Sequence, residues 1–275
     1  MTNRQYSVLM AVYYKERPEF LCQAMESIAK QTVPTNDFVL VCDGPLTDQL
    51  DAVIEEMKIH FGTILNVVRL EKNLGLGNAL NVGIQYCKND LIARMDSDDI
   101  SCEDRCERQL EAFSKIPHLG LLSSSIFEFS EKINEITGKR CVPTNNDDII
   151  SYSHRRNPMN HPAVMFRKSS VEAAGGYSEK FHLFEDYYLW VRMLQKGIVA
   201  ANLEESLLYM RTPPNMFQRR GGVKYAKDML RFRWWMFKSG WSSIIDFVFS
   251  ALPQMLICIL PNEIRKKIYG LFHSK

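Results

Sequence analysis

The 275-residue sequence predicts an α/β protein in which a mostly parallel sheet, flanked by helices, is followed by a basic helical extension. Two observations carry this prediction. Short apolar runs typical of buried strands alternate four times with segments whose apolar residues recur at helical spacing. Positive charge is concentrated at the C-terminal end, where residues 211–275 contain twelve Lys or Arg against three Asp or Glu. The preceding residues contain 22 basic and 29 acidic side chains, so an acidic body precedes a basic tail.

The first half of the chain supplies the four strand and helix pairs. Strands are expected at residues 7–12, 38–42, 66–70 and 91–95. One-sided apolar stripes predict helices at Leu21, Met25 and Ile28, at Leu50, Val53, Ile54 and Met57, and at Leu80, Gly83, Ile84 and Cys87. Parallel strands joined by right-handed crossovers end on one side of a sheet. Asp43, after the second strand, and Asp96, after the fourth, should therefore face the same crevice.

The second half is less regular. Residues 100–105 are expected to open a helix with Ser101 as its cap, and the stripe continues at Cys106, Leu110 and Phe113. Strands are expected at residues 119–129 and 163–166, and a helix is expected from Glu185 with Leu189, Trp190, Met193 and Leu194. The polar stretch at residues 130–157 is expected to be irregular, either as a flap over an acceptor or as a plain surface excursion.

The sequence Asp96-Ser97-Asp98-Asp99 directly follows the buried strand at residues 91–95. Carboxylate oxygens gathered this closely suit Mg²⁺ or Mn²⁺, which completes its shell with substrate phosphates. A metal-diphosphate site is the first hypothesis, and an acidic loop that only caps a helix is the alternative. Glu185-Asp186 is a second acidic pair, and acids in a first helical turn also commonly just complement the helix dipole.

The seven cysteines are scattered through the chain rather than framed as pairs, which favours reduced thiols in a cytoplasmic protein. Residues 1–6 lack the charged and apolar regions of a signal peptide, so secretion is not expected.

Five segments together resemble the GT-A glycosyltransferases of family 2. They are residues 7–14, Val41-Cys42-Asp43-Gly44, residues 73–81, residues 93–99, and Glu185-Asp186 with Leu189-Trp190. The resemblance covers residues 5–210. Within the family the chain is similar to bacterial enzymes of exopolysaccharide, capsule or O-antigen synthesis, with which it shares Ala93-Arg94-Met95-Asp96 and His161-Pro162-Ala163-Val164-Met165-Phe166.

The resemblance implies a GT-A catalytic domain at residues 1–220 and a membrane-associating helical tail at residues 221–275. The catalytic domain would consist of a nucleotide-binding half up to about residue 115 and an acceptor-binding half from about residue 116 to residue 220. The implied activity is transfer of a sugar, with inversion, from a nucleotide diphosphate donor, UDP being the expected nucleotide.

The resemblance also implies roles for individual residues. Nucleotide-sugar binding falls to Ala11, Tyr13, Asp43, Asp96, Ser97 and Asp98. Asp43 would hydrogen-bond the donor's base, Asp96 would contact the ribose or a metal-bound water, and Asp98 would ligate the metal, so the metal positions are Asp98 and Asp96. Asp186 would be the general base. Acceptor or accessory positions are Glu185, His161 and Trp190, although a structural hydrogen-bonding role is expected for His161.

The sequence Gln218-Arg219-Arg220-Gly221-Gly222 does not fit the signature of processive synthases, which implies that one sugar is added per encounter. The expected acceptor is a lipid-linked saccharide, with no nucleic acid partner. Two alternatives remain: a sugar nucleotidyltransferase, which would want a glycine-rich basic loop near the N-terminus, and a non-catalytic membrane-associated scaffold. Residues 13–17 lack those glycines.

The basic tail at residues 225–275 interleaves cations with aromatic residues. They are Arg231, Arg233, Lys238, Trp234, Trp235 and Phe237. The apolar run at residues 244–260 contains Asp246, Pro253 and Gln254, which makes it a poor bilayer span. Tryptophans beside cations suit an anionic membrane surface. We therefore expect a peripheral, monotopic attachment to the inner face of the cell membrane, with docking of these helices on the catalytic domain or a partner as the alternative.

Overall fold

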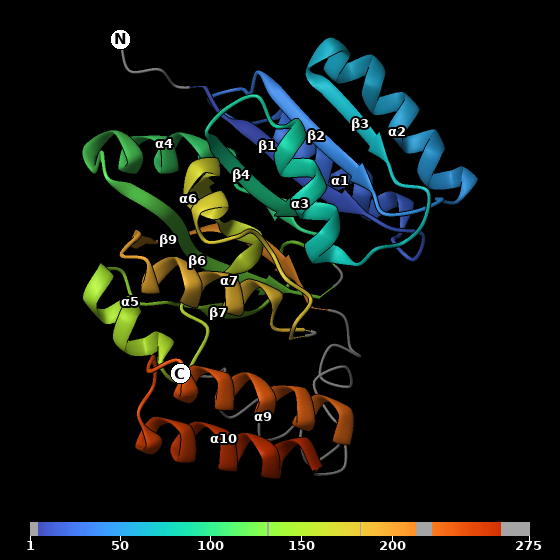
Figure 1. Cartoon of the computed structure of the whole chain (residues 1–275). Helices are drawn as coiled ribbons and strands as arrows, with labels where there is room; N and C mark the ends of the chain where they lie inside the picture. The colour runs from blue at the N-terminus through green and yellow to red at the C-terminus, as the bar shows by residue number, and fades with distance from the viewer. Residues whose placement is uncertain (1–4, 131, 182, 213–221, 260–275) are drawn as a thin grey trace.

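The computed structural model describes residues 5–130, 132–181, 183–212 and 222–259, with side chains up to residue 255 (Figure 1). Its centre is a nine-stranded mixed sheet in the order β3-β2-β1-β4-β8-β6-β9-β5, with β7 paired to β6. The strands are β1 (Ser7–Val12), β2 (Asp37–Cys42), β3 (Leu65–Arg69), β4 (Leu91–Asp96), β5 (Ile100–Ser101), β6 (Leu119–Phe129), β7 (Ile136–Arg140), β8 (Met165–Arg167) and β9 (Val199–Arg211).

Two helical layers cover the sheet. The α-helices are α1 (Pro18–Ala29), α2 (Asp48–Phe61), α3 (Leu76–Tyr86), α4 (Arg105–Lys115), α5 (Asn146–Ser153), α6 (Lys168–Ala173), α7 (Glu185–Gln195), α9 (Val223–Lys238) and α10 (Ile244–Ile259), and the 3-10 helices are η1 (Gly62–Ile64) and η2 (His161–Ala163). Alternate residues of β1 enter opposite cores. Val8 and Met10 contact the layer of α1, α2 and α4, whereas Leu9 contacts the layer of α3, α6 and α7.

The four strands expected in the first half of the chain form a parallel block of the sheet, in the order β3-β2-β1-β4. Ala11 of β1 pairs with Val41 of β2 on one side and with Asp96 of β4 on the other. The carboxyl ends of these three strands therefore meet, and Asp43 and the loop after Asp96 extend from the same edge. This arrangement confirms the predicted α/β architecture with a mostly parallel sheet and flanking helices.

Three local expectations were wrong. Residues 100–105 do not open a helix: Ile100 and Ser101 pair with β9, and α4 begins only at Arg105, because the edge of β9 offers backbone partners that a helical turn would forgo. Residues 130–157 are not irregular throughout, since they contain β7 and α5. The strand expected at residues 163–166 begins later, at Met165, after the η2 turn.

The second half of the chain is built by long-range pairing. β8 lies antiparallel between β4 and β6, and β6 pairs in parallel with β9. No strand was predicted from the sequence at β9, although it is 13 residues long. β9 leads the chain back to the loop after β4, so the end of β9 contacts the acidic loop that follows the fourth strand.

The basic tail begins with α9, which packs on α7 (Figure 1). Phe232 is fully buried, with its ring 5.3 Å from that of Phe184 and 4.9 Å from that of Tyr187. Arg233 is 5% exposed and donates to the backbone carbonyl of Arg155 at 2.5 Å. The alternative expectation, docking on the catalytic domain, therefore holds for α9.

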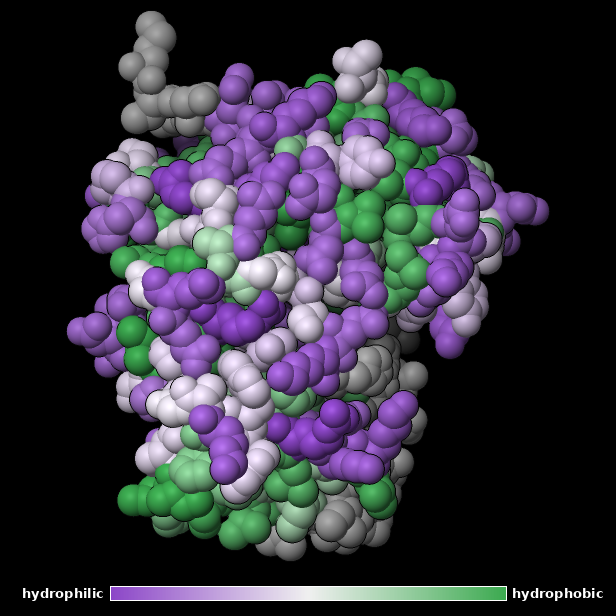
Figure 2. Space-filling view, viewed as in Figure 1, coloured by the Kyte–Doolittle hydropathy of each residue, from purple (hydrophilic) through white to green (hydrophobic). Residues whose placement is uncertain are grey.

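α10 packs on α9 but leaves an apolar stripe on its outer face. We call this the α10 outer face, and its exposed residues are Ile244, Ile245, Val248, Phe249 and Leu252. In the space-filling view, apolar surface gathers over α10 at the lower end of the molecule (Figure 2). Within the described part of the chain, no helix is both long enough and apolar enough to cross a bilayer. The basic cluster at residues 265–267 lies outside the described residues.

Candidate functional site

The acidic loop at residues 96–99 begins where β4 ends. Arg94 of β4 is 1% exposed, and its guanidinium forms a two-pronged ion pair with the Asp96 carboxylate. The Ser97 hydroxyl donates a 2.8 Å hydrogen bond to Glu16, which lies between β1 and α1. Asp96 thus has its charge compensated from inside the protein, and the loop is tied to the end of β1.

Asp98 lies half-buried beside two other carboxylates. Burial, together with the negative charges of Asp96 and Glu16, raises the pKa of the Asp98 carboxyl to about 7. Removing water disfavours the ionised form of a carboxyl group, and like charges nearby disfavour that form further. The site therefore carries more negative charge than its own cations neutralise.

Asp99 and Arg211 hold the loop from the opposite side. The backbone N–H of Arg211 donates to Asp99 at 2.8 Å, and the Arg211 side chain donates from Nε to the Asp98 carbonyl at 3.0 Å. The guanidinium also contacts Gln23 at 2.8 Å and lies 3.7 Å from the centre of the Phe20 ring. Arg211 ends β9, so the second half of the chain fixes the backbone of the acidic loop.

These residues fit a divalent cation bound through few protein oxygens. Among the residues that the structure describes, no three His, Cys, Asp or Glu side chains are arranged as a complete metal cage. Mg²⁺ and similar ions are commonly held by one or two carboxylates plus the oxygens of substrate phosphates. Asp98, whose carboxyl is surrounded by excess negative charge, meets that requirement, while Asp96 is already engaged by Arg94.

Asp43 follows β2 and is 4% exposed. Its two carboxylate oxygens accept hydrogen bonds from the backbone N–H groups of Leu74 at 2.7 Å and Gly75 at 3.1 Å. Asp43 therefore fixes the loop that leads into α3, and each oxygen keeps a second lone pair for a ligand. Ala11 and Tyr13 lie beside it at the end of β1, half-buried and 37% exposed respectively.

Asp186 lies in the first turn of α7. Asn157 donates a 2.7 Å hydrogen bond from Nδ2 to Oδ2 of Asp186. Burial raises the pKa of this carboxyl, whereas the Tyr187 backbone, the Asn157 bond and then the charges of Arg140 and Arg94 oppose the shift. A carboxylate with a raised pKa and a fixed orientation has the properties of a general base.

Glu185, the neighbour of Asp186, is engaged in local structure. Its carboxylate accepts from the backbone N–H of Leu183 at 3.0 Å, and Leu183 has the left-handed φ of 67° that side-chain-bearing residues rarely adopt. A Cβ added to Gly77 of α3 would lie 3.6 Å from Cγ of Glu185. The start of α7 therefore touches α3, which joins the two halves of the chain.

His161 and Trp190 belong to a buried cluster. The His161 Nε2 lies 3.0 Å from the hydroxyl of Tyr177, and the Trp190 ring lies 5.9 Å from the imidazole. Burial, aided by Arg94, lowers the pKa of His161 well below its usual value, so the ring is neutral. Trp190 is fully buried. Trp190 therefore packs on the inner side of α7, while His161, half-buried, is held against it by the Tyr177 hydroxyl.

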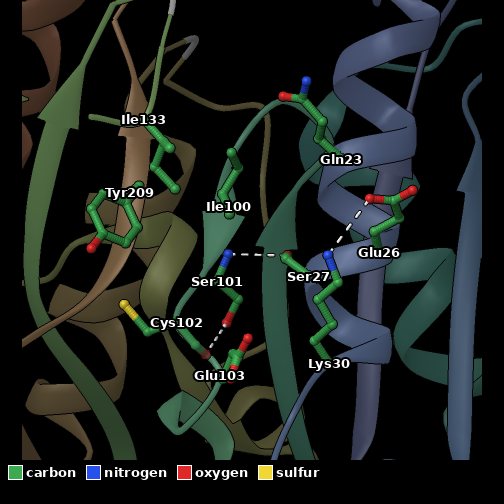
Figure 3. A pocket seen from close by; sticks show the side chains of 10 residues that line it. All are labelled: Gln23, Glu26, Ser27, Lys30, Ile100, Ser101, Cys102, Glu103, Ile133 and Tyr209. Carbon is green, nitrogen blue, oxygen red and sulfur yellow. Dashed lines mark hydrogen bonds and ion pairs between the residues drawn. The ribbon is translucent and has the colours of Figure 1, made fainter. Parts of the chain in front are cut away.

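A pocket of about 410 Å³ opens between α1, β5 and the end of β9 (Figure 3). It is lined by Gln23, Glu26, Ser27, Lys30, Ile100, Ser101, Cys102, Glu103, Ile133 and Tyr209. It includes Gln23, which contacts Arg211, but none of the predicted site residues. The chemistry indicated by the carboxylates therefore lies outside this hollow.

Sequence analysis did not identify Glu16, Arg94, Arg211 or Asn157 as site residues. Arg94 carried a usable signal, because a cation inside an apolar strand requires a buried anionic partner. Arg211 carried none, since 112 residues separate it from Asp99. The structure places Ala11, Tyr13, Asp43, Asp96, Ser97 and Asp98 at the carboxyl edge of β1, β2 and β4, and Glu185 and Asp186 at the start of α7. His161 lies in η2 and Trp190 in the middle of α7.

The model of glycosyl transferase family 2 matches residues 7–172. An Escherichia coli UDP-Gal:alpha-D-GlcNAc-diphosphoundecaprenol beta-1,3-galactosyltransferase is 36% identical over 265 residues, which are 96% of this chain and 95% of the relative. The amylovoran biosynthesis glycosyltransferase AmsE of Erwinia amylovora is 39% identical over 223 residues, 81% of this chain and 82% of the relative.

Solved structures share the fold at low identity. The Pyrobaculum calidifontis mannosyltransferase PcManGT, in complex with GDP-Man and Mn²⁺, superposes with a TM-score of 0.66 at 14% identity, covering 98% of this chain and 80% of that one. The Staphylococcus aureus TarS complex with UDP-GlcNAc gives 0.64 at 18% identity, covering 85% of this chain and 66% of that one. The fold is therefore GT-A, and the chain belongs to glycosyltransferase family 2.

Proposed function

We propose that this glycosyltransferase transfers one sugar, with inversion, from UDP-sugar to a saccharide carried on a lipid diphosphate during synthesis of a cell-surface polysaccharide. The observation that carries the proposal is the Asp186 carboxylate, held by Asn157 at the start of α7 and raised in pKa by burial. The E. coli relative, whose name specifies a UDP-Gal donor and a GlcNAc-diphosphoundecaprenol acceptor, supports this choice of substrates over 96% of the chain.

The donor would lie along the carboxyl edge of the parallel strands. Ala11, Tyr13 and Asp43 would contact the base, while Asp96 and Ser97 would contact the ribose. Asp98 would hold Mn²⁺ or Mg²⁺, and that ion would supply charge neutralisation at the leaving diphosphate. Asp96 would act through its hydrogen bonds rather than as a direct ligand, because Arg94 already occupies its carboxylate.

Asp186 would accept the proton of the attacking acceptor hydroxyl. As that oxygen bonds to the anomeric carbon, the bond from the same carbon to the diphosphate oxygen breaks, and UDP leaves with the electron pair. Attack on the face opposite the leaving group inverts the anomeric carbon. Glu185 would position the turn at Leu183, and His161 with Trp190 would support the acceptor side of the site from below.

The α10 outer face would attach the enzyme to the cytoplasmic, inner face of the cell membrane. Contiguous exposed apolar side chains mark an interaction surface, and an interfacial helix buries such a face at the headgroup boundary. Trp234 of α9, 48% exposed, lies beside Phe247 with ring centres 5.8 Å apart and extends the same surface. Anionic lipid would add attraction for the basic tail.

Membrane attachment is tested by flotation with anionic vesicles. Truncating the tail would uncover the core around Phe232, so point substitutions are the sharper variants. Ile245→Ser with Phe249→Ser should leave the protein folded and abolish flotation, whereas Ile59→Ser, on the exposed side of α2, should float like the wild type. Unchanged flotation of the double variant would remove the α10 outer face from the proposal.

The activity is tested by offering a panel of nucleotide sugars with a synthetic GlcNAc-diphosphate-lipid, with Mn²⁺, Mg²⁺ or EDTA. We expect one disaccharide product with a UDP-sugar, dependent on the divalent ion. Consumption of UTP and a sugar 1-phosphate, with release of pyrophosphate, would instead identify a nucleotidyltransferase. Absence of both turnover and nucleotide binding would identify a scaffold.

A further inference from the structure

Residues 155–157 join the C-terminal helices to the proposed base. The Arg155 side chain donates to Asp246 of α10 at 2.6 Å, and the Arg155 carbonyl accepts from Arg233 of α9 at 2.5 Å. Asn157, two residues later, donates to Asp186 at 2.7 Å. Two residues of chain span at most about 7 Å, so this segment is a short link between the helices and the active site.

Arg156, in the middle of this link, has a different environment. Its side chain is exposed, and no hydrogen bond or ion pair of its guanidinium is found in the described part of the chain. Its backbone N–H donates to Tyr152 at 2.9 Å, which anchors its main chain at the end of α5. An anchored backbone therefore presents a positive charge that has no partner among the described residues, next in sequence to Arg155 and Asn157.

We propose that Arg156 binds the diphosphate of the lipid-linked acceptor. This inference rests on the proposed function and names the part of the protein that recognises the acceptor's anionic group. In such an acceptor the reacting hydroxyl, the sugar ring, the diphosphate and the lipid follow one another in that order. Asn157 with its partner Asp186, then Arg156, then Arg155 with its partners in the helix pair follow one another in the same order along the chain.

The chemistry of the two groups matches. A guanidinium presents several N–H donors in a fixed fork, which suits two oxygens of a diphosphate, and such charge-assisted bonds are the stronger ones. Arg155 cannot serve in the same way without releasing Asp246, with which its side chain is paired. Arg156 is therefore a specificity determinant that selects acceptors carrying phosphate next to the sugar.

The test compares two acceptors that carry the same sugar, one on a diphosphate-lipid and one on an uncharged alkyl chain. Arg156→Ala should lower kcat/KM for the diphosphate acceptor by about 10- to 100-fold, the range of charge-assisted hydrogen bonds, through KM. The uncharged acceptor should lose less than about twofold, and Arg156→Lys should recover part of the loss. Arg108→Ala, an exposed arginine of α4, is the matched control.

Equal losses on both acceptors, or no loss on either, would overturn the role of Arg156. Donor binding, measured as the Kd of UDP with Mn²⁺, should be unchanged in Arg156→Ala, and a weakened Kd would move the residue to the donor site. A wild-type enzyme that binds UDP but glycosylates neither acceptor would refute the proposed function itself, and the inference with it.

Discussion

Replacing Asn157 with Ala changes the environment of the proposed base, Asp186, and leaves Asp186 itself in place. The hydrogen bond from Asn157 stabilises the ionised form of Asp186, so its loss raises a pKa that burial has already raised. A hydrogen bond to a charged group contributes roughly 1.5–3 kcal/mol, and one pKa unit corresponds to about 1.4 kcal/mol. The acid limb of the pH profile of kcat/KM should therefore move by about one to two pH units.

The direction of this movement follows from which form is active. A base works when ionised, so the pH below which activity falls should be higher in Asn157→Ala than in the wild type. The variant should recover toward wild-type rates as pH rises. The assay is initial-rate transfer between pH 5 and 9, with Asn36→Ala, an exposed amide elsewhere, as the control. A uniform fall in rate with an unmoved acid limb would refute Asp186 as the titrating base.

Three further changes test the loop and the tail. Arg211→Lys keeps the backbone bond to Asp99 but loses the guanidinium bonds, so the Kd of UDP with Mn²⁺ should weaken by roughly tenfold or more in calorimetry; an unchanged Kd would contradict its positioning role. Phe232→Ala should lower the free energy of unfolding by about 3–5 kcal/mol in guanidinium titration, while the exposed Phe249→Ala should change it by less than about 0.5 kcal/mol; equal effects would mean that α9 does not share the core. Asp98 has a raised pKa, so the folded state binds more protons than the unfolded one between about pH 4 and 7, and stability falls as pH rises through that window. Asp98→Asn should therefore raise the metal-free Tm at pH 8 and abolish Mn²⁺-dependent UDP binding. Retained Mn²⁺ dependence would reject Asp98 as a metal ligand.

The predictable parts of the fold are those whose burial shows in the pattern of neighbouring residues along the sequence. β1, β2, β3 and β4 are apolar runs because both of their faces are covered, and their helices carry one-sided stripes. β9 is partly exposed and forms through pairing with β6, which lies far away along the chain, whereas β7 is mostly exposed and pairs with β6 just before it in the chain. Local patterns carry little information about such pairing, and the short β5 formed for the same reason.

The site divides in the same way. Asp96, Ser97 and Asp98 could be proposed from the sequence because they are contiguous and follow a buried strand. The residues that hold them could not, since the ion pair of Arg94, the clamp of Arg211 and the Asn157 bond depend on chain segments brought together only by folding. Sequence alone identified the residues expected to react, and the structure supplied the groups that orient them and tune their pKa values.

The most direct test of the account is the rate of sugar transfer by Asp186→Asn measured beside Glu185→Gln, each at saturating UDP-sugar and diphosphate-lipid acceptor. Asp186→Asn should bind UDP with wild-type Kd yet turn over about 10²- to 10⁴-fold more slowly, the usual contribution of a positioned general base. Glu185→Gln, which alters the turn at Leu183, should lose far less. Full activity in Asp186→Asn together with an inactive Glu185→Gln would contradict the assignment and exchange the roles of the two carboxylates.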